Sequence, residues 1–433
     1  MDAHPAPPLK ITRWLVLLCL AVSAAAITWT AWDMAGPARR PMLQGWDDSY
    51  YYFWLPSVVI DHDLDFSNQV EQCRTMNADM REAALAAPRL PSGLPANKYP
   101  PGWAIGSLPF FLAAHVFMPA GSTGFEPPYL LAVWLGQWLY AAAGLWLAIK
   151  ILARYFPPDL AAGAVLTVWL ASPLVYYQTA RLSMSHSQVF ALAMAVFWLA
   201  LRLRDDATRG RDWALLGFCS ALLVVTRNVA VVYLALPAWV VCSKLRAPRA
   251  ALWLALGALP PLAAQLLAWK ILYGSWFAYS YGGERFDFTQ LHFREILFSP
   301  RHGWFYWHPL LLAGIAGFLP WAWSRAEGRA WLVSLGLILV LSAAWPTWWL
   351  GSSFGYRGLE VPVFFAMLGV AVVWQGLSPY PRFRVGCAFF LGLLVAWNLV
   401  LFALFLTQRI PRQEPVTYGE AVRALLSWLA PGA

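Results

Sequence analysis

The sequence predicts an all-α, polytopic membrane protein, and three observations carry this prediction. Of its 433 residues, 60% are hydrophobic and 12% are charged, about half the charged fraction that covers an average soluble protein. Mean hydropathy is +0.53, and there are 27 Trp. The five Cys predict neither a disulfide framework nor a metal cluster, because all but Cys73 lie in apolar runs.

Eleven apolar runs are long enough, some of them barely, to cross about 30 Å of hydrocarbon. A further apolar stretch, 102–118, follows two prolines, contains Pro109 and is short. It is compatible with a span, a re-entrant hairpin or a surface helix. The eleven runs cover residues 14–34, 128–149, 160–177, 187–203, 213–226, 228–243, 250–272, 304–323, 330–346, 361–377 and 385–406.

The distribution of basic residues sets the predicted orientation, because short cytoplasmic loops carry the excess Lys and Arg. With the N-terminus cytoplasmic and 102–118 not crossing, the inside loops hold 15 Lys and Arg against six Asp and Glu. The outside then keeps 16 of each. Letting 102–118 cross would invert every later loop, so we expect it not to cross. Because the charge of +9 falls on these loops, no nucleic-acid partner is predicted.

This topology predicts one integral membrane domain over 1–433 that uses its first span as a permanent anchor. The polar residues gather on the outer face. There we expect a long first loop at 34–101 with juxtamembrane helices, a Tyr- and Arg-rich loop at 273–303, and a tail at 407–433 containing an amphipathic helix.

Two adjacent carboxylates, Asp47 and Asp48, open an aromatic, amphipathic stretch in the first loop. Acids at this position favour a helix N-terminus, so capping is one interpretation. The functional hypothesis is that one carboxylate orients or deprotonates an acceptor hydroxyl at the membrane surface. His186, near the mouth of a span, is a candidate for the same site or a buried polar residue with structural partners.

Several outer cations lie among aromatic residues. Lys98 and Tyr99 precede two prolines, and Arg227 separates two short spans, where a charge is costly unless it faces a cavity or a partner. Arg285 and Arg357 lie in later outer loops. Convergent cations over an apolar groove would suit a polyprenyl phosphate, although each alone is compatible with interfacial anchoring. The sequence lacks Walker, dinucleotide-binding and zinc-type motifs.

Four elements occur in a distinctive order along the chain. They are Asp47-Asp48 leading to Tyr51-Tyr52 and Leu55-Pro56-Ser57, then Lys98-Tyr99-Pro100, then Thr226-Arg227, and finally Ser353 to Arg357. In this order the chain resembles the polyprenyl-phosphate-dependent membrane glycosyltransferases of the GT-C type. This group includes lipid A aminoarabinose transferases and protein O-mannosyltransferases, and the likeness is closest to bacterial dolichyl-phosphate-mannose-transferase-like members.

The resemblance implies an inverting transfer with Asp47 as the catalytic base and Asp48 beside it. Lys98, with Tyr99, would contact the donor phosphate, and Arg227, Arg285 and Arg357 would contact the donor or the leaving group. Many relatives place an Asp in the second outer loop, where this chain has Arg181 to His186. We therefore assign no metal, and His186 could share the role of base.

The predicted function is transfer of a hexosyl or pentosyl group from a polyprenyl-phosphate-linked donor, with no other cofactor assigned. The acceptor would be a hydroxyl of a glycolipid, polysaccharide or protein at the periplasmic face of a bacterial inner membrane, among membrane lipids. A lipid-linked sugar flippase or transporter is the alternative, although its polar residues should lie within the spans. A noncatalytic scaffold is a third reading.

Overall fold

The fold is helical throughout the part of the chain that the computed structural model describes, residues 10–35, 43–245 and 247–430. The chain divides into two compact units. The first unit comprises Met1–Thr28, Leu145–Ala180 and Phe286–Ala433. The second unit comprises Trp29–Gly144 and Arg181–Arg285. Most predicted site residues therefore belong to the second unit, and Arg357 belongs to the first.

All eleven predicted apolar runs coincide with helices, which confirms a polytopic all-α membrane protein. Within the described residues, six helices are long and apolar enough to span a membrane: α1 (Lys10–Ala35), α6 (Pro127–Leu152), α9 (His186–Asp205), α12 (Pro248–Tyr273), α16 (Ala326–Ala343) and α18 (Pro381–Leu406). The other runs form shorter helices: α7 (Pro158–Leu170), α8 (Leu174–Tyr177), α10 (Gly210–Thr226), η2 (Asn228–Leu234), α11 (Ala235–Lys244), α14 (Trp304–Trp307), α15 (Pro309–Trp323) and α17 (Val363–Gly376).

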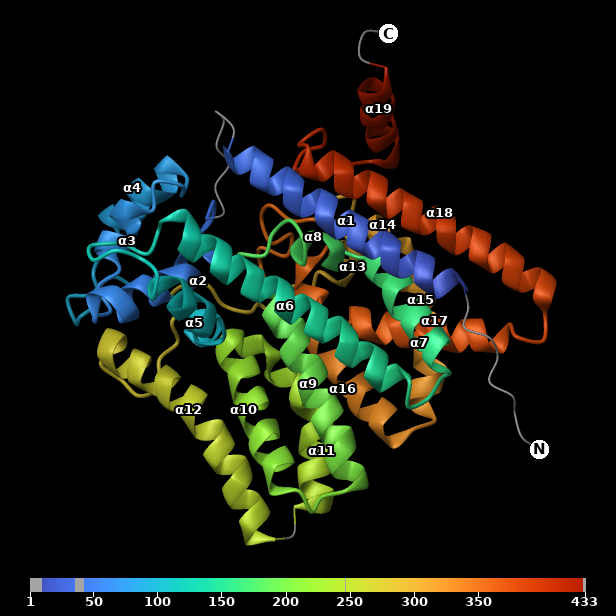
Figure 1. Ribbon diagram of the computed structural model, residues 1–433, viewed down its shortest axis with the longest axis horizontal. Helices are drawn as coiled ribbons and strands as arrows, with labels where there is room; N and C mark the ends of the chain where they lie inside the picture. Colours follow the sequence, from blue (N-terminus) through green and yellow to red (C-terminus); the bar gives the residue numbers. More distant parts are fainter. Residues whose placement is uncertain (1–9, 36–42, 246, 431–433) are drawn as a thin grey trace. The chain divides into compact units, whose positions relative to one another are not determined.

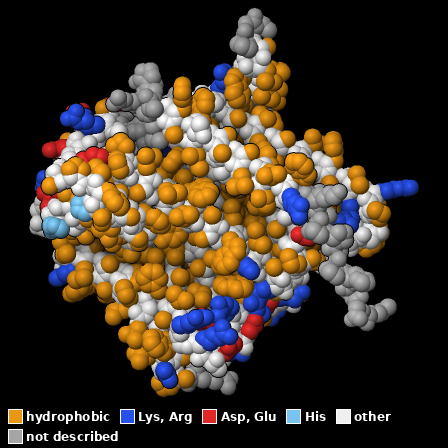
Figure 2. Space-filling model, in the orientation of Figure 1, with side chains coloured by type: hydrophobic (Ala, Val, Ile, Leu, Met, Phe, Trp, Pro, Cys, Tyr) orange, Lys and Arg blue, Asp and Glu red, His pale blue; other side chains and the backbone are white. Residues whose placement is uncertain are grey.

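Hydrophobic side chains cover much of the visible surface in Figure 2. On α12, for example, Leu252, Leu256 and Leu259 are each about half exposed. A water-soluble helix would turn such residues inward, whereas hydrocarbon solvates them. These helices therefore present the surface expected of a protein embedded in lipid.

In the second unit, α9, α10, α11 and α12 lie side by side (Figure 1). The α10 and α12 backbones approach closely at two glycines, one on each helix. A Cβ on Gly217 would fall 2.1 Å from the Leu254 carbonyl oxygen. A Cβ on Gly257 would fall 1.9 Å from that of Ala214. Small residues are what permit such close approach of helices in membranes.

The first outer loop folds into short helices in the second unit: α2 (Trp46–Pro56), a π-helical turn (Ser57–Asp61), α3 (Ser67–Gln72) and α4 (Ala78–Ala86). α5 (Gly102–His115) follows. With 14 residues, α5 is about 21 Å long, less than the hydrocarbon thickness. That 102–118 does not cross remains a prediction.

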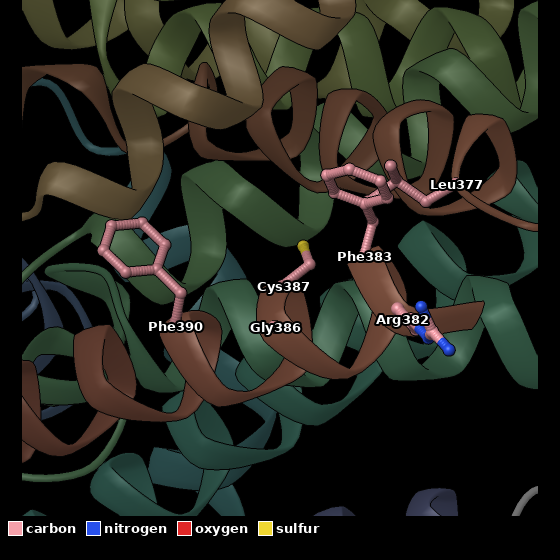
Figure 3. A pocket seen from close by; sticks show the side chains of 6 residues that line it. All are labelled: Leu377, Arg382, Phe383, Gly386, Cys387 and Phe390. Carbon is pink, nitrogen blue, oxygen red and sulfur yellow. The ribbon is translucent and has the colours of Figure 1, made fainter. Parts of the chain in front are cut away.

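In the first unit, α15 packs on α17 through Gly314 and Gly369. α19 (Tyr418–Leu429) occupies the predicted amphipathic segment, and its first turn is capped by reciprocal hydrogen bonds of Thr417 and Glu420. A cavity of about 740 Å³ lies where α17 turns into α18 (Figure 3). Its lining contains none of the predicted site residues: Leu377, Arg382, Phe383, Gly386, Cys387 and Phe390.

Candidate active site

Asp48 caps α2. Its carboxylate accepts hydrogen bonds from the backbone N–H groups of Gly45, at 2.9 Å, and Gln44, at 3.2 Å. The side chain is fully buried and pairs with the guanidinium of Arg181, Nη2 to Oδ2, at 2.6 Å. Ser183 adds a hydroxyl at 3.4 Å. These contacts are those of the capping alternative, and they tie the second outer loop to the start of α2.

Asp47, one residue earlier, is partly exposed and accepts a hydrogen bond from the phenol of Tyr99. Tyr99 is held on three sides. Its N–H donates to Asn97 Oδ1 at 3.0 Å, its carbonyl accepts from Trp54 at 3.1 Å, and its ring packs 5.0 Å from that of Tyr51. Burial, followed by the nearby Asp47 carboxylate, raises the pKa of Tyr99 well above its usual value. The phenol therefore keeps its proton and fixes the orientation of Asp47.

Lys98 lies between two aromatic rings and a carboxylate. Its Nζ is 5.5 Å from the ring centroid of Tyr99 and 5.4 Å from that of Tyr281. The same Nζ is 2.5 Å from Glu284 Oε1. Ser280 donates to the Lys98 carbonyl at 2.8 Å, so the loop after α12 holds the backbone as well as the side chain. The Lys98 side chain is about one-third exposed, which leaves it within reach of an anionic ligand.

Arg227 joins this group through Tyr281. Burial raises the pKa of Tyr281 well above its usual value, and the charge of Arg227 opposes that rise. The carboxylates of Asp47 and Glu284 contribute to the same rise. Such electrostatic effects require the charges to lie near one another. Tyr281 thus keeps its proton; its ring centroid lies 5.4 Å from Lys98 Nζ, and Asp47, Glu284 and Arg227 are within electrostatic reach of its hydroxyl.

A close contact brings the start of α5, which follows Lys98, against the end of α10, which precedes Arg227. A Cβ on Gly102 would fall 2.3 Å from the backbone nitrogen of Thr226, so only glycine lets the start of α5 approach the end of α10 this closely. The fully buried Gln188 on α9 joins the same two segments. Its amide donates to the Gly102 carbonyl at 2.8 Å and to the Thr226 hydroxyl at 2.9 Å.

The remaining predicted residues have different surroundings. His186 begins α9, three residues after Ser183, and is buried. Arg285 is exposed beside Glu284. Arg357, in the first unit, begins a 3₁₀ turn, Arg357–Leu359, that follows Ser353, whose hydroxyl is 3.0 Å from the phenol oxygen of Tyr177. A role for each of these three in the site stays a prediction.

Four residues of this group were not proposed from the sequence: Arg181, Gln188, Tyr281 and Glu284. Some indication of Tyr281 and Glu284 was present in the sequence, since both lie in the predicted Tyr- and Arg-rich loop. Their partners are 133 residues away for Arg181 and 186 for Glu284. A pairing across that separation has no local pattern in the sequence. Among the described residues, no three His, Cys, Asp or Glu side chains form a group that could hold a metal ion.

Comparison with known proteins identifies the fold. No family model matches the chain, and no curated protein matches its sequence. Two crystal structures of ArnT from Cupriavidus metallidurans, one bound to undecaprenyl phosphate and one in the apo state, each match with a TM-score of 0.51. The matches cover 96% of this chain and 72% of ArnT, at 14% and 15% identity. ArnT is a polytopic membrane protein of the GT-C type.

This chain has the GT-C fold. At this identity the likeness concerns the fold, and a shared fold does not by itself assign roles to residues. Within this GT-C fold, the second unit contains the carboxylate of Asp47 and the cations Lys98 and Arg227. It also contains Tyr99 and Tyr281, which both keep their protons. The expected resemblance to GT-C proteins is therefore confirmed at the level of architecture.

Proposed function

We propose that this protein is a glycosyltransferase that moves a sugar from a polyprenyl-phosphate-linked donor to a hydroxyl acceptor. The observation that carries the proposal is that Tyr99 links a carboxylate to a cation: its phenol donates to Asp47, and its ring centroid lies 5.5 Å from Lys98 Nζ. A carboxylate beside cations in one compact unit can take a proton and stabilise an anionic leaving group. The GT-C fold supports this reading.

In the proposed reaction, the acceptor hydroxyl attacks the anomeric carbon from the face opposite the lipid phosphate, so the configuration inverts. Asp47 takes the acceptor's proton, which requires the two oxygens to come within about 2.6–3.2 Å. The bond from the anomeric carbon to the phosphate oxygen breaks, and its electron pair stays on the phosphate. Lys98 and Arg227 stabilise the negative charge that develops there.

The neighbouring residues have supporting roles in this proposal. Tyr99 orients Asp47, and Asp48 holds the N-terminus of α2 so that Asp47 faces the site. His186 is proposed to share the role of base, and Arg285 and Arg357 to contact the donor or leaving group.

The proposed site faces the periplasm, and the N-terminus is cytoplasmic, because the basic residues concentrate in the opposite loops. The acceptor would be a glycolipid, polysaccharide or protein, and the transferred group a hexose or pentose. The setting proposed is a bacterial inner membrane.

The test is transfer of radiolabelled sugar from total bacterial polyprenyl-phosphate sugars to an endogenous membrane fraction, in vesicles of known orientation. Asp47→Asn should abolish transfer at matched expression. Asp79→Asn, an exposed acid-to-amide change in the same loop, is the control and should leave it intact. Movement of the lipid-linked sugar between leaflets, without transfer, in the wild type and Asp47→Asn alike would replace this proposal with a flippase.

A further inference from the structure

Glu284 occupies the position at Lys98 that an anionic ligand would need. Its Oε1 lies 2.5 Å from Lys98 Nζ, a charge-assisted hydrogen bond. The two side chains are 48% and 31% exposed. An ion pair this accessible to water is weak and exchanges readily, so a stronger anion can take the ammonium from Glu284.

The backbone of Glu284 is held locally, since its N–H donates to the Tyr281 carbonyl at 3.1 Å and its carbonyl accepts from the Tyr279 hydroxyl at 2.5 Å. Gly274 and Gly282, which bound the loop ahead of it, have φ of 73° and 59°. An added Cβ at Gly274, Gly282 or Gly283 would meet nothing within 4 Å. These glycines therefore serve backbone conformation and not close packing, and exchange at Lys98 needs only rotation of the exposed Glu284 side chain.

The proposed reaction changes the charge of the lipid phosphate. The donor is a phosphodiester with one negative charge. Breaking the bond to the sugar leaves the electron pair on the phosphate oxygen, while the acceptor's proton passes to Asp47 and then to water. The product is a monoester with about 1.5 to 2 negative charges near pH 7. Lys98 and Arg227 therefore bind the product more tightly than the donor, which would slow its release.

We propose that Glu284 exchanges with the lipid phosphate at Lys98, leaving when the donor binds and returning to expel the product. This inference rests on the proposed function and adds Glu284 as a residue for product release. Because the carboxylate competes with every phosphate at Lys98, it lowers the affinity for the product at the end of each cycle.

The direct test measures binding of undecaprenyl phosphate and of undecaprenol to the full chain in nanodiscs. Glu284→Gln should bind undecaprenyl phosphate about two- to fivefold more tightly, the range expected for losing an exposed ion-pair competitor. Its affinity for undecaprenol should not change. Glu82→Gln, an exposed acid-to-amide change in the first outer loop, controls for general removal of negative charge and should have no effect.

A double-mutant cycle shows whether the effect acts through Lys98. Lys98→Gln should weaken binding of undecaprenyl phosphate about tenfold or more, and Glu284→Gln should add nothing to it. In sugar transfer at saturating donor, where donor affinity no longer matters, Glu284→Gln should slow the steady state more than the first turnover, as expected when product release limits the rate.

These measurements distinguish failure of the proposed function from failure of the exchange role of Glu284. If the wild type binds undecaprenyl phosphate no better than undecaprenol, the phosphate site of the proposed function is wrong. If the wild type prefers the phosphate but Glu284→Gln binds it equally or more weakly, the exchange role of Glu284 is wrong and the proposed function stands. If Glu284→Gln still increases the affinity for undecaprenyl phosphate in the Lys98→Gln background, the exchange role of Glu284 is also wrong.

Discussion

The carboxylate of Asp48 and the guanidinium of Arg181 form a buried ion pair at 2.6 Å, joining the start of α2 to the second outer loop. Asp48 also accepts two backbone hydrogen bonds at the helix N-terminus. The carboxylate is therefore fully engaged in holding the structure, one residue away from the proposed base.

Replacing Arg181 with Met should destabilise the fold by about 3 kcal/mol, because it leaves the carboxylate buried without its counter-charge. Thermal or denaturant unfolding in detergent would measure this loss. Arg382→Met, at the surface cavity between α17 and α18, is the matched control and should change stability little. Unaltered stability in Arg181→Met would show that the pair contributes nothing to the fold.

Tyr99→Phe should lower the transfer rate about tenfold while Asp47 keeps its charge, because the base loses a hydrogen bond worth about 1.4 kcal/mol. The loss should appear in kcat more than in KM if Tyr99 only orients Asp47. A raised KM with an unchanged kcat would instead assign Tyr99 to donor binding, the role that the family resemblance implies.

Gly102→Ala should destabilise the protein by about 2 kcal/mol, since the new Cβ would meet the backbone of Thr226 at 2.3 Å and something must shift. Binding of undecaprenyl phosphate should weaken with it, because Lys98 and Arg227 would move apart. Gly163→Ala on α7, where a Cβ would meet nothing within 4 Å, should be neutral or slightly stabilising. Equal behaviour of the two variants would contradict the close packing of α5 on α10.

His302 predicts a pH dependence of stability. It is buried in the first unit with φ of 65°, and its ring nitrogens lie 2.8 Å and 3.1 Å from the carbonyl oxygens of Trp349 and Arg412. Burial lowers the pKa of His302 from 6.5 to about 4, although the hydrogen bonds to the carbonyls of Trp349 and Arg412 favour the charged ring and oppose the shift. The unfolded chain therefore binds more protons between these two pH values, so stability is complete above about pH 6.5 and falls toward pH 4.

The expected loss from His302 on acidification is about 3 kcal/mol. Unfolding temperatures of the wild type and His302→Asn, measured at pH 7 and pH 4.5, would test it. Asn tolerates the left-handed backbone and does not titrate in this range, so its unfolding temperature should fall less on acidification. An equal fall in both proteins would show that other groups control acid sensitivity.

The sequence could predict the helices because a membrane span needs an unbroken apolar run, and each such run is visible locally. It could also predict that Arg227 is unusual, since a charge between two short spans is costly unless it faces a cavity or a partner. Span lengths were less predictable. Prolines and glycines divide some runs, so that 160–177 forms α7 and α8 separately.

The difference between Asp47 and Asp48 could not be read from the sequence. Two adjacent carboxylates are chemically alike, but successive residues of a helix point about 100° apart. Only the folded partners decide which is buried against Arg181 and which faces Tyr99. The pairing of Lys98 with Glu284 was equally hidden, because it depends on how the loop after α12 returns to the first outer loop.

The amide of Gln188 has a consequence for how the bundle is assembled in lipid. Hydrocarbon solvates every apolar helix face about equally, so hydrophobicity alone does not set the rotation of one helix against another. Hydrogen bonds do, and Gln188 bonds to Gly102, Thr226 and Gln137, which in turn bonds to Ser107. Four helices, α5, α6, α9 and α10, thus have their rotational register specified from within. The segments that carry the charged site residues are thus joined by neutral amides and hydroxyls buried among these four helices.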